Sequence, residues 1–135
     1  MKITTRMLED EVYESTSEDG ITARIDTRPA PQKKNQSPVE LLLSSLAACG
    51  AVDIVLMLKK RKKTVQAFVI ETEGTRRTET PRSFTAIHCH YSLTSDNVTE
   101  EELLKLTKLS LEKYCSVADS LKASITFSVQ VIAPY

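Results

Sequence analysis

Three cysteines are the residues of this chain best suited to chemistry, because a thiolate is a nucleophile that can be oxidised reversibly. They are Cys49, Cys89 and Cys115, which lie far apart in the sequence and have no Cys-x-x-Cys spacing. Their odd number and wide spacing favour neither a secreted disulfide framework nor a thiolate zinc site. Such thiols are either inert core residues or redox-active groups.

Cys49 lies in an apolar run, residues 46–51, where small neighbours would let another element approach closely. A cysteine among apolar helical residues is more often a small hydrophobic residue than a nucleophile. Burial would disfavour its thiolate, and so would the carboxylate of Asp53, one helical turn further on. A reactive Cys49 therefore needs a cation nearby.

Cys115 lies at a change of pattern, where one predicted helix ends and another begins. A thiol at a helix N-terminus is easier to ionise, so this position suits a reactive cysteine. The alternative is a loop cysteine that fills a gap in the packing. The sequence leaves both readings open.

Two histidines flank the remaining cysteine. On a strand, His88 and His90 would share one face, and Cys89 would point to the other. Two imidazoles on one face are weak candidate metal ligands, but no third ligand follows at a suitable spacing. A histidine pair at the surface or at a dimer interface is the alternative. We expect no metal and no other cofactor.

Composition and charge narrow the functional classes. The chain has 135 residues, enough for one domain (1–135), with 18 basic and 18 acidic side chains. A net charge of zero does not favour nucleic acid or an anionic membrane as a partner. The basic run 59–63 suits the C-terminal end of a helix better than a nucleic-acid patch. No signal-peptide pattern begins the sequence, so we expect a cytoplasmic protein.

The elements that must position the cysteines can be predicted from local patterns. Residues 1–28 predict a small antiparallel β meander, with Asp19 and Gly20 at a turn. Residues 29–36 contain two prolines and several polar side chains, which predicts a loop.

A long apolar helix follows. Ser37, Pro38 and Glu40 match a helix start with a capping box, and we predict the central helix over 37–61. It is apolar nearly all round, which fits a helix buried on most faces or a membrane span. Asp53 near its middle disfavours a span. One chain of this size has little material to wrap the helix, so a homodimer that buries it between subunits is the simpler expectation.

The second half of the chain predicts strands and helices. Two strands occupy 64–95, helices occupy 99–122 after a second capping box at Thr99, and a last strand occupies 124–132. The order is therefore β-β-β-α-β-β-α-α-β, an α+β fold class in which a sheet packs on helices. In detail, the strands are predicted at 64–73 and 84–94 with a loop at 74–82, and the helices at 99–114 and 116–122.

Several motifs in the same order resemble the OsmC and organic hydroperoxide resistance superfamily. They are Ser-Pro-Val-Glu-Leu-Leu-Leu at 37–43, Ala-Cys at 48–49 and Glu-Lys-Tyr-Cys-Ser-Val at 112–117. Cys-Gly-Ala-Val-Asp-Ile-Val at 49–55 and Thr-Pro-Arg-Ser-Phe-Thr at 80–85 are most similar to its YhfA-like branch. The resemblance spans most of the chain.

This resemblance implies an OsmC-like fold that forms an intertwined homodimer, with long central helices buried between sheets and two active sites at the interface. It also implies a redox pair. In the peroxidase branches, the helix cysteine attacks the peroxide, becomes a sulfenic acid and is resolved by the second cysteine as a disulfide. By resemblance, Cys49 is the peroxidatic cysteine and Cys115 is the resolving cysteine.

One position departs from the peroxidase branches. They carry a glutamate directly after the proline of the helix start, and it holds an arginine that stabilises the thiolate. Val39 stands there in this chain, and Glu40 lies about 100° further round the helix, where its capping role explains it. Glu40 is therefore a secondary candidate, as are Arg24 and Arg28 for the partner arginine.

Two functions follow as alternatives. The first is an OsmC-like, thiol-dependent reductase of organic hydroperoxides that works through Cys49 and Cys115 and is recycled by an unknown thiol reductant. Apolar helix and strand residues would line a pocket for the alkyl chain. The second is a non-enzymatic homodimer that binds a small apolar ligand or a partner, with the cysteines as structural remnants. Val39 motivates this second reading.

Overall fold

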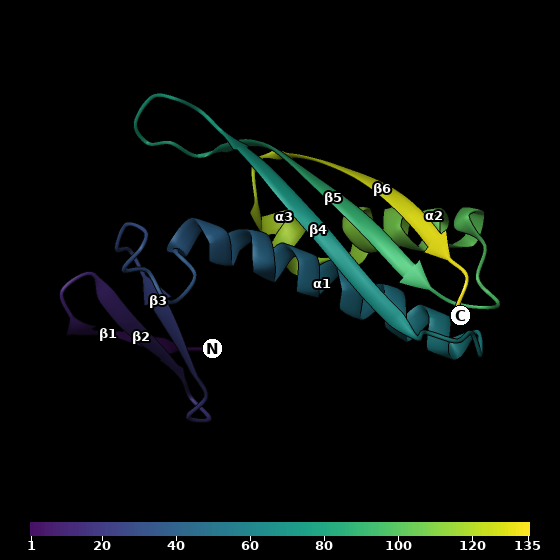
Figure 1. The fold of residues 1–135 in the computed structure, drawn as a ribbon, viewed down its shortest axis with the longest axis horizontal. Coiled ribbons are helices and arrows are strands. Elements are labelled where there is room, and N and C mark those ends of the chain that lie inside the picture. Colours follow the sequence, from purple (N-terminus) through teal and green to yellow (C-terminus); the bar gives the residue numbers. More distant parts are fainter. The chain divides into compact units, whose positions relative to one another are not determined.

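A computed structural model describes all residues, 1–135. The predicted α+β class and element order are confirmed: three strands, a long helix, two strands, a helical segment in pieces and a last strand. The chain forms two compact units, residues 1–42 and 43–135, and each is described by itself (Figure 1). The single-domain organisation and the homodimer stay predictions.

The first unit contains a three-stranded antiparallel sheet. Its strands are β1 (Ile3–Glu9), β2 (Val12–Ser17) and β3 (Thr22–Asp26), paired in the order β1-β2-β3. Gly20 lies in the turn between β2 and β3 with φ 84°, a conformation that glycine adopts without steric cost. This arrangement matches the meander predicted for residues 1–28.

Helix α1 (Pro38–Lys60) begins at the predicted capping box. The N–H of Glu40 donates to Ser37 Oγ at 3.3 Å, and the N–H of Ser37 donates to Glu40 Oε1 at 3.0 Å. These bonds satisfy N–H groups that the first turn of a helix leaves without partners. Lys59 and Lys60 occupy the last turn, where cations suit the helix dipole.

Helix α1 carries apolar side chains that the rest of the second unit does not cover. It is long and apolar enough to span a membrane, with a mean hydropathy of 2.2, and 22% of that stretch is buried. In the second unit, Leu46, Ile54 and Leu58 are buried, whereas Val52 and Leu56 are 56% and 51% exposed. Burying such a surface is favourable, so this face is suited to a covering partner.

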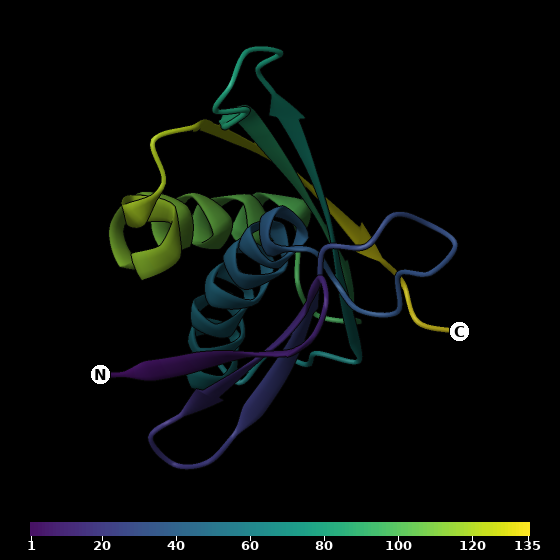
Figure 2. The same ribbon diagram turned by 90° about the vertical axis from the view of Figure 1, so that its left-hand side faces the viewer.

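The second unit packs helices against one face of a three-stranded sheet. Its strands are β4 (Ala67–Arg76), β5 (Phe84–Thr94) and β6 (Ser124–Ile132), in the order β4-β5-β6. β4 and β5 are antiparallel, whereas β5 and β6 are parallel and therefore need a crossover. Helices α2 (Glu100–Leu109) and α3 (Ser116–Ser120) form it, on the same side of the sheet as α1 (Figure 1 and Figure 2).

A π-helical turn, η1 (Ser110–Tyr114), carries the chain from α2 to α3. Its wide turn closes when the N–H of Cys115 donates to the carbonyl of Ser110 at 2.7 Å. Short π-helical turns of this kind are rare in proteins, and those that occur are often found at functional sites. The predicted helix through residue 114 is thus present, but its last turn is wider than an α-helical one.

The second capping box forms only in part. The N–H of Glu102 donates to Thr99 Oγ1 at 3.1 Å, as predicted. The carboxylate of Glu102 lies 3.1 Å from Arg61 and 3.6 Å from Lys63. Glu102 therefore pairs with Arg61 and Lys63, which follow α1 directly. These two cations of the basic run 59–63 thus have a structural role.

Strand β4 begins at Ala67, later than the predicted Thr64. The chain first turns at Lys62, which has φ 58°, and the N–H of Thr64 then donates to Asn97 Oδ1 at 2.9 Å. These contacts hold residues 62–66 in a connection rather than a strand. The strand in turn continues to Arg76, so the hairpin loop is shorter than predicted.

The core lies between the helices and the inward face of the sheet. Alternate residues of β5 are fully buried, and the predicted inward alternation of β6 is confirmed. On β4 the inward face is the opposite of the one that Val69 occupies, because Val69 is 58% exposed. The inward residues are Phe68, Ile70 and Thr72 of β4, Ile87, Cys89, Tyr91 and Leu93 of β5, and Ile125, Phe127, Val129 and Val131 of β6.

Candidate functional site

The three cysteines come from different elements of the second unit. Cys49 lies on α1, Cys89 on β5, and Cys115 between η1 and α3. All three are free thiols, and Cys49 is half-buried whereas the other two are buried. Burial is the largest cause that raises the pKa of Tyr91, and the charges of all three thiols raise it further. The three thiols therefore lie within electrostatic reach of one buried hydroxyl.

Cys49 and Cys115 interact directly. Burial raises the pKa of Cys115 to about 11, and a hydrogen bond with the Cys49 thiol contributes to the rise. A bond between backbone and side chain supports this arrangement, because Ser110 Oγ donates to the carbonyl of Gly50 at 2.9 Å. It ties the residue after Cys49 to the turn that leads to Cys115. The structure brings the two cysteines together, and their roles stay predictions.

Burial governs the ionisation of Cys115 more than its helix does. Cys115 is the N-cap of α3, and the N–H of Ala118 donates to its Sγ at 3.4 Å, which lowers its pKa. Burial, at 3% exposure, outweighs this bond. The expectation that a helix N-terminus makes this thiol easy to ionise is therefore wrong for α3, which has only five residues. At neutral pH, Cys115 holds its proton.

Cys89 faces the same interior. It lies opposite Thr72 in the ladder between β4 and β5, and burial raises its pKa. The hydroxyls of Tyr91 and Thr72 are close enough to favour its ionised form. Both hydroxyls interact with the Cys89 thiol, but neither buried oxygen has a hydrogen bond of regular geometry. The interior next to Cys89 thus holds two hydroxyls that are only weakly hydrogen-bonded by a thiol.

Tyr91 is the residue of this site that sequence reasoning missed. It is fully buried, and its ring packs against Phe68 with 5.8 Å between the centroids. Gly50 makes room for its hydroxyl, since a Cβ at Gly50 would lie 2.7 Å from Tyr91 Oη. Two signals were available: Tyr91 shares the inward face of a strand with Cys89, and a glycine follows Cys49 inside a helix.

Two hollows adjoin the thiols. One, of about 220 Å³, opens at Cys115 and has polar walls from η1 and α3. The other, of about 470 Å³, lies between α1 and β4 and includes Ala48, the neighbour of Cys49. Its lining is mostly apolar and consists of Leu43, Ser44, Ala47, Ala48, Ile70 and Thr72.

The two candidate arginines lie in the first unit and differ in their partners. Arg28 binds the fully buried Asp26 through two contacts, Nε to Oδ1 at 2.9 Å and Nη2 to Oδ2 at 2.7 Å. This pairing is the main cause that holds the pKa of Asp26 far below its usual range. Arg24 is mostly exposed, and its ion pair with Glu14 is long, at 3.7 Å. Arg24 therefore has the more available guanidinium.

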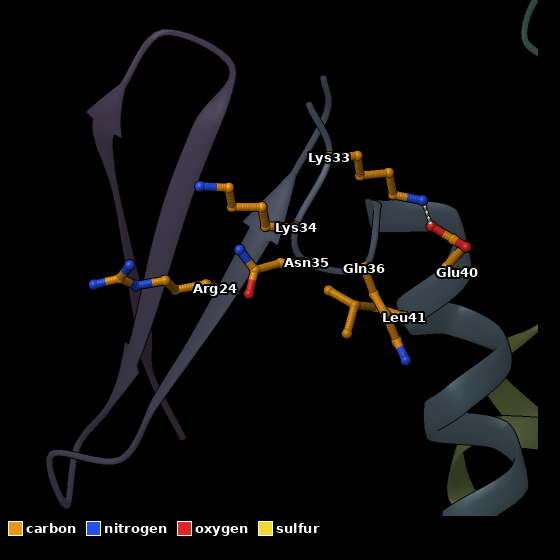
Figure 3. Close-up of a pocket in the computed structure, with 7 residues that line it drawn as sticks. All are labelled: Arg24, Lys33, Lys34, Asn35, Gln36, Glu40 and Leu41. Atoms are coloured by element: carbon orange, nitrogen blue, oxygen red, sulfur yellow. Dashed lines mark hydrogen bonds and ion pairs between the residues drawn. The ribbon is translucent and has the colours of Figure 1, made fainter. Parts of the chain in front are cut away.

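Glu40 has a local role at the start of α1. Its bond with Lys33 and its capping bonds with Ser37 lower its pKa to about 2. Figure 3 shows this Lys33–Glu40 pair at one wall of a hollow of about 680 Å³, with Arg24 and Lys34 pointing away from the helix. Three cations and one carboxylate line the hollow, so its walls carry net positive charge.

His88 and His90 lie on the outward face of β5, as predicted. His88 hydrogen-bonds with Thr126 Oγ1 at 2.7 Å and with Ser128 Oγ at 3.0 Å. His90 hydrogen-bonds with the same Ser128 hydroxyl at 2.6 Å. No group of three or more His, Cys, Asp or Glu side chains is arranged to hold a metal ion. Both imidazoles therefore hydrogen-bond with hydroxyls of β6.

Comparison with known proteins gives one family. The family model described as OsmC-like protein matches residues 31–130. Protein YhfA of Escherichia coli (strain K12) is 36% identical over 102 residues, which cover 74% of this chain and 76% of YhfA.

Solved structures agree with this match. A hypothetical protein from Aquifex aeolicus VF5 has a TM-score of 0.86 at 27% identity, covering 99% of this chain and 97% of that chain. The organic hydroperoxide resistance protein OhrB of Bacillus subtilis has a TM-score of 0.64 at 14% identity, covering 98% of each chain. At this low identity, the similarity to OhrB shows a shared fold alone.

Proposed function

This chain belongs to the OsmC-like protein family, and from that membership we propose that it reduces organic hydroperoxides, with Cys49 as the attacking thiol and Cys115 as the resolving thiol. The observation that carries the proposal is the interaction of these two thiols within one compact unit. The name of OhrB, an organic hydroperoxide resistance protein with the same fold, supports the substrate class.

The reaction has two steps, after which a reductant regenerates the two thiols. The Cys49 thiolate attacks the hydroperoxide, the O–O bond breaks, an alcohol leaves, and Cys49 becomes a sulfenic acid. The Cys115 sulfur then attacks the Cys49 sulfur, an S–S bond forms, the S–O bond breaks, and the oxygen leaves as water. The hydroperoxide gains the two electrons that the thiol pair loses. An external thiol reductant restores both thiols by exchange.

The apolar hollow between α1 and β4 suits the alkyl chain of such a substrate. Leu43 and Ile70 supply apolar walls, and the lining includes Ala48, which precedes the proposed attacking residue in α1. Removing apolar surface from water favours binding by about 25 cal/mol per Å². An organic hydroperoxide would therefore bind better than hydrogen peroxide, which has no such surface.

The resemblance implies an arginine that favours the attacking thiolate, and of the two candidates we propose Arg24, whose guanidinium is the more available. The guanidinium of Arg28 is held by Asp26, and removing it would leave a buried carboxylate without its partner. Arg24 has a long ion pair and lines a hollow of net positive charge. Glu40 acts in the capping box rather than in the reaction.

We also assign the protein to the cytoplasm as a homodimer, without a nucleic-acid or membrane partner. The exposed apolar side chains of Val52 and Leu56 favour a second copy of α1 as their cover. The net charge of zero gives no general attraction to polyanions.

The test is mass spectrometry after non-reducing digestion of protein treated with one equivalent of cumene hydroperoxide, with hydrogen peroxide in parallel. We expect a fast Cys49–Cys115 disulfide that forms faster with the organic peroxide. Cys49→Ser should abolish peroxide consumption, whereas Cys89→Ser, the matched control, should retain it. Thiols that react no faster than free cysteine would refute the proposal and favour the ligand-binding alternative.

The arginine assignment has its own test. Arg24→Ala should slow the oxidation of Cys49 by roughly 100-fold, because a lost charge partner disfavours the thiolate, and should leave the melting temperature nearly unchanged. Arg28→Ala should lower the melting temperature, because it leaves the buried Asp26 carboxylate without its partner. Any change in the oxidation rate of this variant would then follow from the loss of stability. Equal oxidation rates in Arg24→Ala and the parent protein would remove Arg24 from the mechanism.

A further inference from the structure

We propose that the hydroxyl of Tyr91 serves the resolving step, in which it donates a hydrogen bond to the oxygen leaving Cys49 and accepts the proton of Cys115. This inference rests on the proposed function, since it assigns a residue to the second half of that reaction. The Thr72 hydroxyl is buried in the same way, but it lies opposite Cys89 in the sheet.

The position of the hydroxyl is the first support. Tyr91 is fully buried, and its oxygen has no hydrogen bond of regular geometry, only an interaction with the Cys89 thiol. A buried hydroxyl without a partner is costly, so such groups are uncommon in folded proteins. Its ring is held by Phe68, and the glycine at position 50 lets the oxygen approach the backbone next to Cys49. The position of the hydroxyl is thus fixed, and its proton is held only by a weak interaction with the Cys89 thiol.

The surroundings of the hydroxyl are the second support. The titratable groups that face it are the three thiols, Cys49 from α1, Cys89 from β5 and Cys115 ahead of α3. Ser110 is also nearby, but its hydroxyl already donates to the carbonyl of Gly50. Thr72 lies across the ladder from Cys89 and not from the reacting pair. Tyr91 is therefore the hydroxyl that both reacting sulfurs share.

The chemistry of the resolving step is the third support. Cys115 is buried and keeps its proton at neutral pH, so its sulfur must lose that proton as it attacks. The oxygen on Cys49 must gain a proton to leave as water. A hydroxyl within electrostatic reach of both sulfurs can pass one proton on as it receives the other. The tyrosine is unchanged at the end, and the products are one disulfide and one water.

The test is Tyr91→Phe, which removes the oxygen and keeps the ring. After a pulse of cumene hydroperoxide, dimedone trapping measures the sulfenic acid on Cys49, and non-reducing digestion measures the disulfide. We expect Cys49 to oxidise at the parental rate, while disulfide formation slows by roughly 100-fold. Trapped sulfenic acid and its over-oxidation product should both increase.

The pH profile separates a proton relay from a packing role. In Tyr91→Phe, the rate of disulfide formation should follow the Cys115 thiolate and rise about tenfold per pH unit toward pH 11. In the parent protein the rate should vary much less over the same range. A purely structural role for Tyr91 would lower both profiles in parallel.

Tyr114→Phe is the matched control, because it makes the same change at a half-exposed tyrosine next to Cys115. It should leave both steps unchanged. If Tyr91→Phe forms the disulfide at the parental rate, Tyr91 has no part in resolution and the proposed function stands. If the parent protein itself forms neither sulfenic acid nor disulfide, the proposed function fails and this inference fails with it.

Discussion

At the scale of single residues, the Tyr91 hydroxyl lies where it lowers stability. It is buried without a hydrogen bond of regular geometry, and an unsatisfied buried polar group costs about 1–3 kcal/mol. Tyr91→Phe should therefore raise the free energy of unfolding by about 1 kcal/mol while it slows disulfide formation. Urea denaturation of the reduced protein measures this gain.

Thr107 provides the control for that prediction. Its hydroxyl is also buried without a partner, but it lies on α2 and is not among the groups that act on the thiols. Thr107→Val should stabilise the protein by a similar amount and leave the oxidation chemistry unchanged. A loss of stability in Tyr91→Phe would show that its hydroxyl has a partner, which would contradict the description of the site.

Titration of Cys115 should make the stability of the folded protein fall as the pH becomes alkaline. Burial raises its pKa in the folded protein to about 11, above the value of 9.0 for an unperturbed thiol. Between these values the unfolded chain loses the proton and the folded chain keeps it, so stability falls as pH rises from about 9 to 11. Under reducing conditions, Cys115→Ser should make this decline in melting temperature shallower. An unchanged slope would mean that the thiol titrates normally.

At the scale of elements, Gly50 sets the distance between α1 and β5. Alanine normally stabilises a helix interior by about 1 kcal/mol relative to glycine. Here the new Cβ would lie 2.7 Å from Tyr91 Oη and 3.3 Å from Leu111 Cδ2. Gly50→Ala should therefore destabilise the protein, by roughly 1–3 kcal/mol, as measured by thermal unfolding.

The double variant shows which contact is responsible. Tyr91→Phe removes the atom that the new Cβ meets at 2.7 Å. Gly50→Ala should therefore cost less in the Tyr91→Phe background than in the parent chain, a coupling expected of residues in contact. Additive effects would place the strain at Leu111 instead.

Local patterns predicted most of the elements but not their contacts. The start of α1 and the bounds of β5 and β6 follow from the capping box and from alternation, which are local properties. The start of β4 was misplaced because Thr64 donates to Asn97, a contact between residues far apart in the sequence. The π-helical turn before Cys115 has no sequence pattern of its own.

The candidate site was predictable in its residues more than in its geometry. Cys49 and Cys115 could be paired only through family resemblance, because nothing local links residues so far apart. Tyr91 was missed because an aromatic residue on the inward face of a strand is typical of a core. Its distinguishing feature, a buried hydroxyl without a hydrogen bond of regular geometry, is a property of the packed structure.

At the scale of the whole molecule, we predict a homodimer held by α1. One chain has a mass of 15.1 kDa, so sedimentation should give twice that mass. Changing Val52 and Leu56 together to glutamate should yield monomers, because charges would replace exposed apolar surface at the predicted interface. Equilibrium sedimentation measures both masses.

Leu104→Glu is the control for the dimer prediction. Leu104 is 47% exposed on α2, so the variant adds a charge to an exposed helical leucine outside α1. It should leave the dimer intact. A monomeric parent protein, or a dimer that survives both charges on α1, would exclude this helix as the interface.

The bond between Ser110 and Gly50 also has a consequence for biosynthesis. It joins residues 60 positions apart, and contacts of such sequence separation form late because the intervening chain must first lose its entropy. Until then, a newly made chain carries three unprotected thiols that can each form a wrong disulfide. We therefore expect correct folding of this protein to require a reducing environment, before the proposed reaction of its thiols can begin.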